Sequence, residues 1–184
     1  MTIRQLRQKN IALLGFGIEN RAVANYFDQH HIPYTIFDSN PNICLQNCNL
    51  ILRSHVGPNY LEALHDFELI FRTPGFPPTH QAIQKAKRNG ALVTSQTQMF
   101  FNLCPSKLIG ITGTKGKGTT TKILECLLRE TSDQRVFVGG NIGIPPISFV
   151  DQLKKNDHVI LELSSFQLQD LNSSPHIAVL LAVG

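Results

Sequence analysis

Short apolar runs alternate along this chain with longer segments in which apolar residues recur every three or four positions. The short runs are typical of buried strands, and the longer segments are typical of amphipathic helices. Helices are expected after residue 17, near 59–65, 79–89 and 95–102, after the loop at 113–117, and briefly from 145. Strands are expected at 10–15, 34–37, 50–52, 69–71, 91–94, 108–111, 136–138, 157–163 and 176–183. This alternation predicts an α/β fold with mainly parallel sheets.

A loop of glycines, threonines and lysines separates the strand at 108–111 from the next helix. Glycines let backbone N–H groups curl around an anion, and a helix N-terminus adds unpaired donors and partial positive charge. Lys117 ends the loop, where a lysine reaches the terminal phosphates of a nucleotide. The common signature has a glycine at the place of Ile111 and a hydroxyl at the place of Gly118, and this chain has neither.

We interpret this loop as a nucleotide-phosphate site, although strand-to-helix turns without a ligand have similar compositions. The helix after it carries an apolar stripe formed by Ile123, Leu124, Leu127 and Leu128. The residues expected to bind the phosphates are Gly113, Thr114, Lys115, Gly116, Lys117, Gly118, Thr119 and Thr120.

Glu162 interrupts the otherwise apolar strand at 157–163. A carboxylate inside such a strand is costly unless it is paired or bound to a cation. An acid at the end of a neighbouring strand holds magnesium in other P-loop enzymes. We therefore expect Glu162 to bind Mg²⁺, and a salt bridge is the alternative.

The first strand leads into Gly15-Phe16-Gly17, a helix follows, and the next strand ends on Asp38. This order is typical of the opening of a Rossmann-type domain, with the acid about 20 residues past the glycines. Asn20 occupies the place of the third glycine, which favours a nucleotide or nucleotide sugar over a nicotinamide dinucleotide. Thr73-Pro74-Gly75 follows another strand, at the edge where open α/β sheets bind ligands, although Pro-Gly also makes plain turns.

Composition narrows the class of protein. The length of 184 residues suits one large domain or two small ones. A net charge of +4 suits anionic ligands, but the basic residues are scattered, so nucleic acid is not expected. The four cysteines and seven histidines show no metal-ligand spacing. Because no signal peptide and no apolar stretch of roughly 20 residues is evident, we expect a soluble cytoplasmic protein without membrane insertion.

Three sequence blocks together resemble the Mur ligase family: G-I-T-G-T-K-G-K-G-T-T at 110–120, V-G-G-N-I-G at 138–143 and L-E-L-S-S-F-Q-L at 161–168. G-F-G-I-E-N at 15–20 and T-P-G at 73–75 resemble the family's first domain. The resemblance implies a Rossmann-like UDP-sugar-binding domain at 1–103, followed at 104–184 by part of a P-loop ATPase-like central domain. The last block is specific to the branch of the family that adds D-glutamate.

The resemblance also implies an activity and its residues. The reaction is ATP-dependent ligation of D-glutamate to UDP-N-acetylmuramoyl-L-alanine through an acyl phosphate, in peptidoglycan precursor synthesis. Lys117 is implied to contact the ATP phosphates and Glu162 to hold Mg²⁺, with Thr119 or water supplying the oxygen that Gly118 lacks. The residues implied in substrate binding are Gly15, Phe16, Gly17, Ile18, Glu19, Asn20, Asp38, Thr73, Pro74, Gly75, Asn141, Ser164 and Gln167.

The family continues beyond the point where this chain stops. We therefore expect an N-terminal portion that cannot form the amide bond alone and whose last strand, 176–183, presents an edge that invites pairing into an oligomer. Two other functions stay open: a non-catalytic nucleotide or UDP-sugar module, and another Mur ligase or folylpolyglutamate synthase-like ligase. A dinucleotide-dependent oxidoreductase using Gly15, Gly17 and Asp38 is a third, but it leaves the phosphate loop and Glu162 unexplained.

Overall fold

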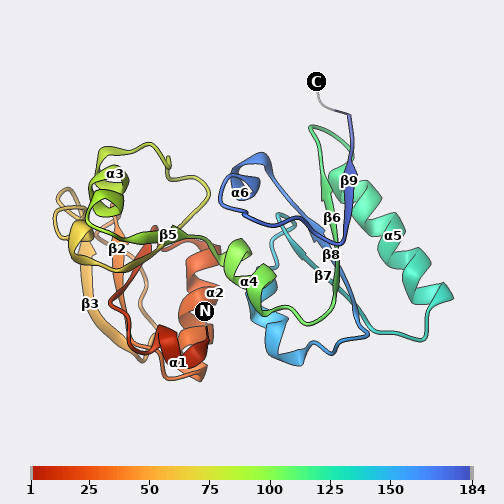
Figure 1. The fold of residues 1–184 in the computed structure, drawn as a ribbon, viewed down its shortest axis with the longest axis horizontal. Helices are drawn as coiled ribbons and strands as arrows, with labels where there is room; N and C mark the ends of the chain where they lie inside the picture. The colour runs from red at the N-terminus through yellow and green to blue at the C-terminus, as the bar shows by residue number, and fades with distance from the viewer. Residues whose placement is uncertain (1, 183–184) are drawn as a thin grey trace. The chain divides into compact units, whose positions relative to one another are not determined.

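The computed structural model describes residues 2–182 and divides into two compact units, one up to Gln96 and one from Thr97 onward (Figure 1). The sheet in each unit is entirely parallel, which confirms the predicted α/β class. The division lies at the start of helix α4 (Gln96–Leu103), and the boundary expected from the sequence lies at the other end of that helix. That boundary stays a prediction. Over residues 2–182, no helix combines the length and apolar character needed to cross a membrane.

The first unit has five strands in the order β3-β2-β1-β4-β5. They are β1 (Ile11–Leu14), β2 (Tyr34–Asp38), β3 (Ile51–Val56), β4 (Leu69–Arg72) and β5 (Leu92–Thr94). Its helices are α1 (Ile3–Leu6), α2 (Ile18–Gln29), α3 (Gln81–Arg88) and the 3₁₀-helix η1 (Leu64–Asp66). The strand order reverses between β1 and β4, and open α/β sheets bind their ligands at such a point.

Helices α2 and α3 cover opposite faces of this sheet. Phe27 of α2 meets Phe71 of β4 edge-on, with ring centroids 5.4 Å apart. The neighbouring Ile70 packs with Ile83 of α3 in a buried cluster. Because successive strand residues point to opposite faces, the two helices lie on different sides, and β1 and β4 are buried along their whole length.

Two expectations about the first unit are wrong in part. The helix expected near 59–65 is a series of turns followed by η1, with hydrogen bonds between residues three apart. Gly57, which has a φ of 83°, and Pro58, which lacks an N–H, open this segment with residues that favour turns. Strand β3 is longer than the expected 50–52, because it is an edge strand whose exposed positions accept polar residues.

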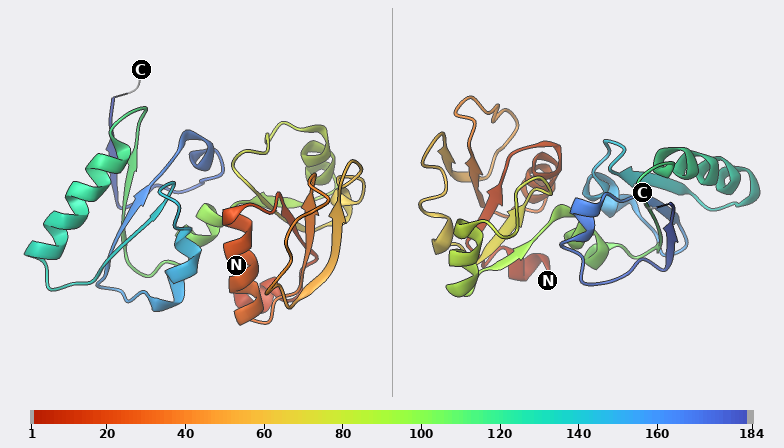
Figure 2. Two further views of the ribbon diagram at one scale, coloured as in Figure 1. Left: turned by 180° about the vertical axis from the view of Figure 1, so that it is seen from behind. Right: turned by 90° about the horizontal axis from the view of Figure 1, so that it is seen from above.

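The second unit has four strands in the order β7-β8-β6-β9. They are β6 (Lys107–Thr112), β7 (Val136–Gly140), β8 (His158–Glu162) and β9 (Ile177–Leu180). The remaining elements are α5 (Lys117–Thr131), α6 (Ser165–Leu168) and the 3₁₀-helix η2 (Pro146–Gln152), which replaces the short helix expected from 145. Figure 2 shows α5 lying along one face of the sheet.

Only half of the apolar stripe predicted for α5 is packed. Leu124 and Leu128 contact a buried cluster on the sheet. Ile123 and Leu127 are 57% and 53% exposed. Arg129, on the other flank of the helix, donates to the carbonyl oxygen of Val136 in β7 at 3.0 Å. Ile123 and Leu127 therefore lie on the flank of α5 that faces away from β7. They stay exposed because α5 covers only part of the sheet.

Strand β9 lies at the edge of the sheet, beside β6. Ile177 and Leu180 are 55% and 70% exposed. The strand is shorter than the expected 176–183, and residue 183 lies outside the described residues. Pairing of this edge into an oligomer stays a prediction.

Candidate functional site

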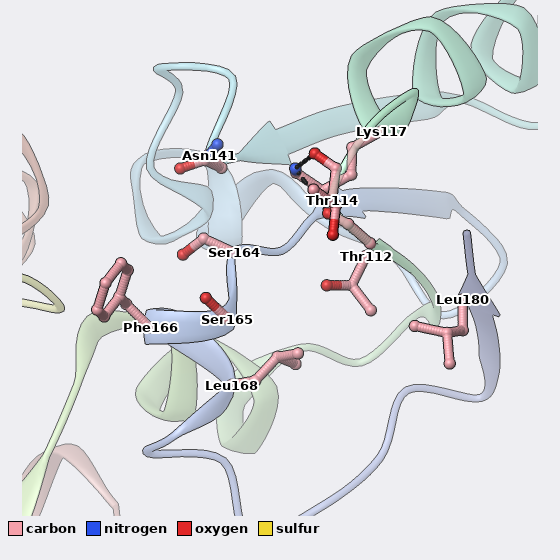
Figure 3. A pocket seen from close by; sticks show the side chains of 10 residues that line it. Thr112, Thr114, Lys117, Asn141, Ser164, Ser165, Phe166, Leu168 and Leu180 are labelled. Carbon is pink, nitrogen blue, oxygen red and sulfur yellow. Dashed lines mark hydrogen bonds between the residues drawn. The ribbon is translucent and has the colours of Figure 1, made fainter. Parts of the chain in front are cut away.

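A pocket of about 580 Å³ opens in the second unit, where the carboxyl ends of β6 and β8 meet the start of α5 (Figure 3). This is the edge at which parallel sheets bind ligands. Its lining combines the loop between β6 and α5 with polar and apolar side chains from the turn after β7, from α6 and the residue before it, and from β9: Thr112, Gly113, Thr114, Lys117, Asn141, Ser164, Ser165, Phe166, Leu168 and Leu180.

Two glycines shape the loop between β6 and α5. Gly116 precedes α5 in the left-handed region, at a φ of 83°, where a side chain would be strained. A Cβ on Gly113 would lie 2.8 Å from the Cβ of Leu181, so the loop passes directly against the residue after β9. Among the described residues, no side chain caps the start of α5. The first N–H groups of this helix are therefore available to an anion.

The ammonium group of Lys117 folds back over this loop. Its Nζ donates to the carbonyl oxygen of Gly113 at 2.9 Å and to that of Thr114 at 3.5 Å, as the dashed lines in Figure 3 mark. A phosphate held by the loop would meet this charge at close range. Gly118, Thr119 and Thr120 follow within the first turn of the helix, and Lys115 is exposed.

Glu162 ends strand β8 and is only 6% exposed. Its Oε1 accepts a hydrogen bond from Nδ2 of Asn141 at 3.0 Å. Over residues 2–182, no lysine, arginine or histidine forms an ion pair with it, so the alternative of a structural salt bridge has no support. The position that a Cβ on Gly118 would take is 3.3 Å from Oε2. This oxygen therefore faces the first turn of α5.

The turn after β7 brings Asn141 to this carboxylate. Gly140 has a φ of 100°, and a Cβ on it would lie 2.1 Å from the carbonyl oxygen of Glu162. The same oxygen accepts the N–H of Asn141 at 2.8 Å. Only glycine permits this approach, which explains the Gly139-Gly140-Asn141 run as more than a simple turn.

Ser164 and Gln167 form a capping box at the start of α6. The Ser164 hydroxyl accepts the N–H of Gln167 at 3.2 Å, and the Gln167 Oε1 accepts the N–H of Ser164 at 3.0 Å. Ser164 lines the pocket, whereas Gln167 is 2% exposed and supports the turn from below. Phe166 also lines the pocket and is 58% exposed. The sequence did not predict it as a site residue, because a single apolar residue among polar ones does not show whether its side chain is buried or exposed.

The first unit brings its predicted residues together at the carboxyl ends of β1, β2 and β4. The N–H of Phe16 donates to Oδ2 of Asp38 at 2.5 Å. A Cβ on Gly15 would lie 2.5 Å from Oγ1 of Thr73, which places the 15–17 loop against the 73–75 loop. Gly17 and Ile18 are exposed at the start of α2, Glu19 is half-buried and Phe16 is buried.

Asn20 lies behind this loop rather than on its surface. The residue is fully buried, and its Nδ2 lies 3.1, 2.8 and 3.0 Å from the carbonyl oxygens of Leu14, Gly15 and Phe71. It therefore ties the end of β1 to the end of β4. Asn20 positions the loop and would reach a ligand only through the backbone that it holds.

Arg72 supports the second loop, and the sequence interpretation missed it. It is fully buried at the end of β4, and its guanidinium donates to the carbonyl oxygens of Thr73, Pro74 and Phe76. Pro74 and Gly75 therefore have a fixed backbone. An arginine at the end of an apolar strand, directly before Thr-Pro-Gly, was the available signal.

Comparison with known protein families matches both units. Residues 9–95 match the family described as Mur ligase MurD-like, N-terminal domain, and residues 111–184 match the Mur ligase middle domain. The structure of a murein peptide ligase from Psychrobacter arcticus aligns with 84% of this chain and 37% of its own, with a TM-score of 0.50 and 16% identity, which supports the fold alone.

Curated relatives extend the similarity across the whole chain. UDP-N-acetylmuramoylalanine–D-glutamate ligase of Acetivibrio thermocellus is 36% identical over 181 residues, which are 96% of this chain and 39% of the relative. The Clostridium tetani ligase of the same name is 38% identical over 176 residues, which are 93% of this chain and 38% of the relative. The chain therefore spans about two fifths of the length of these relatives.

Proposed function

This chain belongs to the Mur ligase family, and we propose that it is part of a ligase that uses ATP to join D-glutamate to UDP-N-acetylmuramoyl-L-alanine in peptidoglycan precursor synthesis. One observation carries the proposal: Lys117, at the uncapped start of α5, lines the pocket, and the buried carboxylate of Glu162 lies against the first turn of the same helix. A pocket of about 580 Å³ is within the range that holds a small-molecule ligand.

In the proposed ATP site, the backbone of 113–119 cradles the phosphates and Lys117 contacts the β- and γ-phosphates. Thr114, Lys115, Gly116, Gly118 and Thr120 complete this loop. The existing contacts of Lys117 with carbonyl oxygens support the assignment, because the ammonium already lies over the loop. Its charge offsets the negative charge that develops as the phosphoryl group is transferred.

Glu162 is the proposed ligand of Mg²⁺, and its fit rests on a buried carboxylate that has no cationic partner among the described residues. Within residues 2–182, no three acidic, histidine or cysteine side chains lie close enough together to hold a metal ion. Protein side chains alone therefore do not complete the coordination of Mg²⁺ here. Magnesium bound with a nucleotide commonly takes one or two carboxylates plus phosphate oxygens and waters. When bound, it would supply charge neutralisation at the phosphates.

The residues proposed to bind the substrate lie in both units. The UDP part is bound by Gly15 to Asn20, Asp38 and the loop at 73–75. These residues lie where the strand order reverses between β1 and β4, which is where open α/β sheets bind nucleotides. Asn141 and Ser164 serve the muramoyl-alanine end, and Gln167 serves it through the hydrogen bond that its Oε1 accepts from the N–H of Ser164. The substrate carboxylate accepts the γ-phosphoryl group, and the amine of D-glutamate then displaces phosphate. The contribution of these residues is alignment and exclusion of water.

Calorimetric titration of residues 1–184 tests this proposal. ATPγS with Mg²⁺ and UDP-N-acetylmuramoyl-L-alanine are each expected to bind, and NAD is expected not to bind. Gly15→Val should abolish binding of the UDP sugar alone, because its side chain would overlap Thr73. Absence of ATPγS binding alongside intact UDP-sugar binding would favour a non-catalytic module, and tighter binding of NAD than of the UDP sugar would refute the assignment of the first unit.

A further inference from the structure

Gly118 places no side chain in front of the Glu162 carboxylate. Gly118 is the second residue of α5, and a Cβ on it would lie 3.3 Å from Oε2 of Glu162. Within the described part of the chain, no other atom counted as a neighbour lies within 4 Å of that position. In phosphate loops, the residue after the lysine supplies a hydroxyl to the magnesium ion. Glycine supplies none.

Thr119 is the next hydroxyl along the chain, but it points elsewhere. An α-helix turns by about 100° for each residue, so the Thr119 side chain leaves α5 about a quarter turn away from the direction of Gly118. Thr119 is exposed, whereas Glu162 is buried. The other carboxylate oxygen, Oε1, already accepts the hydrogen bond from Asn141. Apart from Thr119, which helix geometry directs elsewhere, no hydroxyl of α5 lies within 4 Å of the position that a Cβ on Gly118 would take.

We propose that a water molecule fills the cation's coordination position beside Gly118, and that Thr119 is not a metal ligand. The proposal rests on the proposed function, because it concerns the same site. A cation held through Glu162 and nucleotide phosphates, with water where a serine or threonine hydroxyl would otherwise bind, keeps one more exchangeable water. Gly118 therefore sets both the affinity for the metal and its hydration.

Substitutions at positions 118 and 119 separate these two oxygen sources. The probe is Mn²⁺ with ADP, bound to residues 1–184, followed by electron paramagnetic resonance and by the relaxation of water protons. Gly118→Ser is expected to tighten Mn²⁺ binding about tenfold and to remove one water from the bound ion. Gly118→Ala adds the same Cβ without the oxygen, and we expect it to match the parent in hydration. The φ of Gly118 is not positive, so neither substitution strains the backbone.

Thr119→Val is the matched test of the neighbouring hydroxyl. It is expected to leave both the Mn²⁺ affinity and the water count unchanged, whereas Glu162→Gln should lose most of the affinity. Loss of affinity in Thr119→Val, or a gain of one water, would overturn the proposal by making Thr119 a ligand. Equal hydration in Gly118→Ser and Gly118→Ala would overturn it as well. Failure of the parent to bind ADP at all would refute the ATP site itself, and the inference with it.

Discussion

Removal of the Lys117 ammonium is expected to weaken binding of nucleoside triphosphate more than binding of diphosphate. Lys117→Ala deletes one good hydrogen bond, to Gly113 at 2.9 Å, and one at the limit of contact, to Thr114 at 3.5 Å. These bonds to carbonyl oxygens within the loop contribute about 0.5–1.5 kcal/mol each at most. The unbound chain should therefore lose little stability.

The larger loss concerns the nucleotide. Two unit charges 4 Å apart attract by about 1 kcal/mol in bulk water and about 4 kcal/mol at an effective dielectric constant of 20. Lys117 is half-buried, so its environment lies between these limits. A charge-assisted hydrogen bond of about 1.5–3 kcal/mol falls in this range and corresponds to a loss of affinity of about tenfold to hundredfold. ADP lacks the γ-phosphate, so its affinity should fall less in Lys117→Ala than the affinity for the triphosphate.

Titration calorimetry with ATPγS and ADP, each with Mg²⁺, measures this difference directly. Lys122→Ala is the matched control, since Lys122 lies on the same helix but is exposed and paired with Glu125 at 2.8 Å. Its effect on either nucleotide is expected to stay within twofold. Affinity of Lys117→Ala equal to that of the parent, or an equal loss in the Lys122 variant, would refute the assignment of this lysine.

Three further predictions concern contacts that support the fold of the two units. Gly140→Ala should lower the free energy of unfolding of the second unit by about 2 kcal/mol or more, and its thermal midpoint with it, because its Cβ would overlap the carbonyl oxygen of Glu162. Gly143→Ala, with a similar φ but open space, is the control, and equal effects of the two substitutions would contradict the reasoning. Asn20→Ala should lower the free energy of unfolding by about 1–3 kcal/mol and weaken UDP-sugar binding while ATPγS binding is retained; an unchanged denaturant midpoint would argue against its ties to β1 and β4. Hydrogen bonds from Arg135 lower the pKa of Asp157, so this carboxylate stabilises the fold above the ordinary aspartate pKa near 4, and the contribution is lost as pH falls through the lowered value. Asp157→Asn should therefore flatten the acid side of the stability profile, and an unaltered profile would rule this out.

Asn141 and Glu162 show a contact that the sequence alone does not predict. The sequence indicates a tight turn and a costly carboxylate, but not that one side chain donates to the other at 3.0 Å. That contact depends on β7 lying beside β8, with Gly140 opposite Glu162 in register. A crossover connection joins these parallel strands, so no short turn fixes their register and the spacing of residues along the chain does not show which ones lie opposite each other.

Asn20 and Ile123 illustrate the same limit. Asn20 occupies a position in a known loop pattern, and that pattern indicates contact with a ligand. In the structure, its side-chain NH₂ group instead donates to three backbone carbonyl oxygens inside the unit. Ile123 has the spacing of a core residue but is exposed, because α5 covers only part of the sheet. Periodicity assigns a residue to a side of a helix, and the neighbouring elements decide how much of that side is covered.

The sequence by itself determined the α/β class, the order of the strands along the chain, and the glycine-rich turn that leads from β6 into α5. These follow from hydrophobic period and from glycine and lysine spacing, which act within a few residues of one another. Only the tertiary structure decided that Glu162 faces Gly118 rather than a cationic partner, and that Arg72 holds the loop after β4. Such contacts join segments far apart along the chain, and they exist only once the parallel strands have aligned their carboxyl ends at one edge.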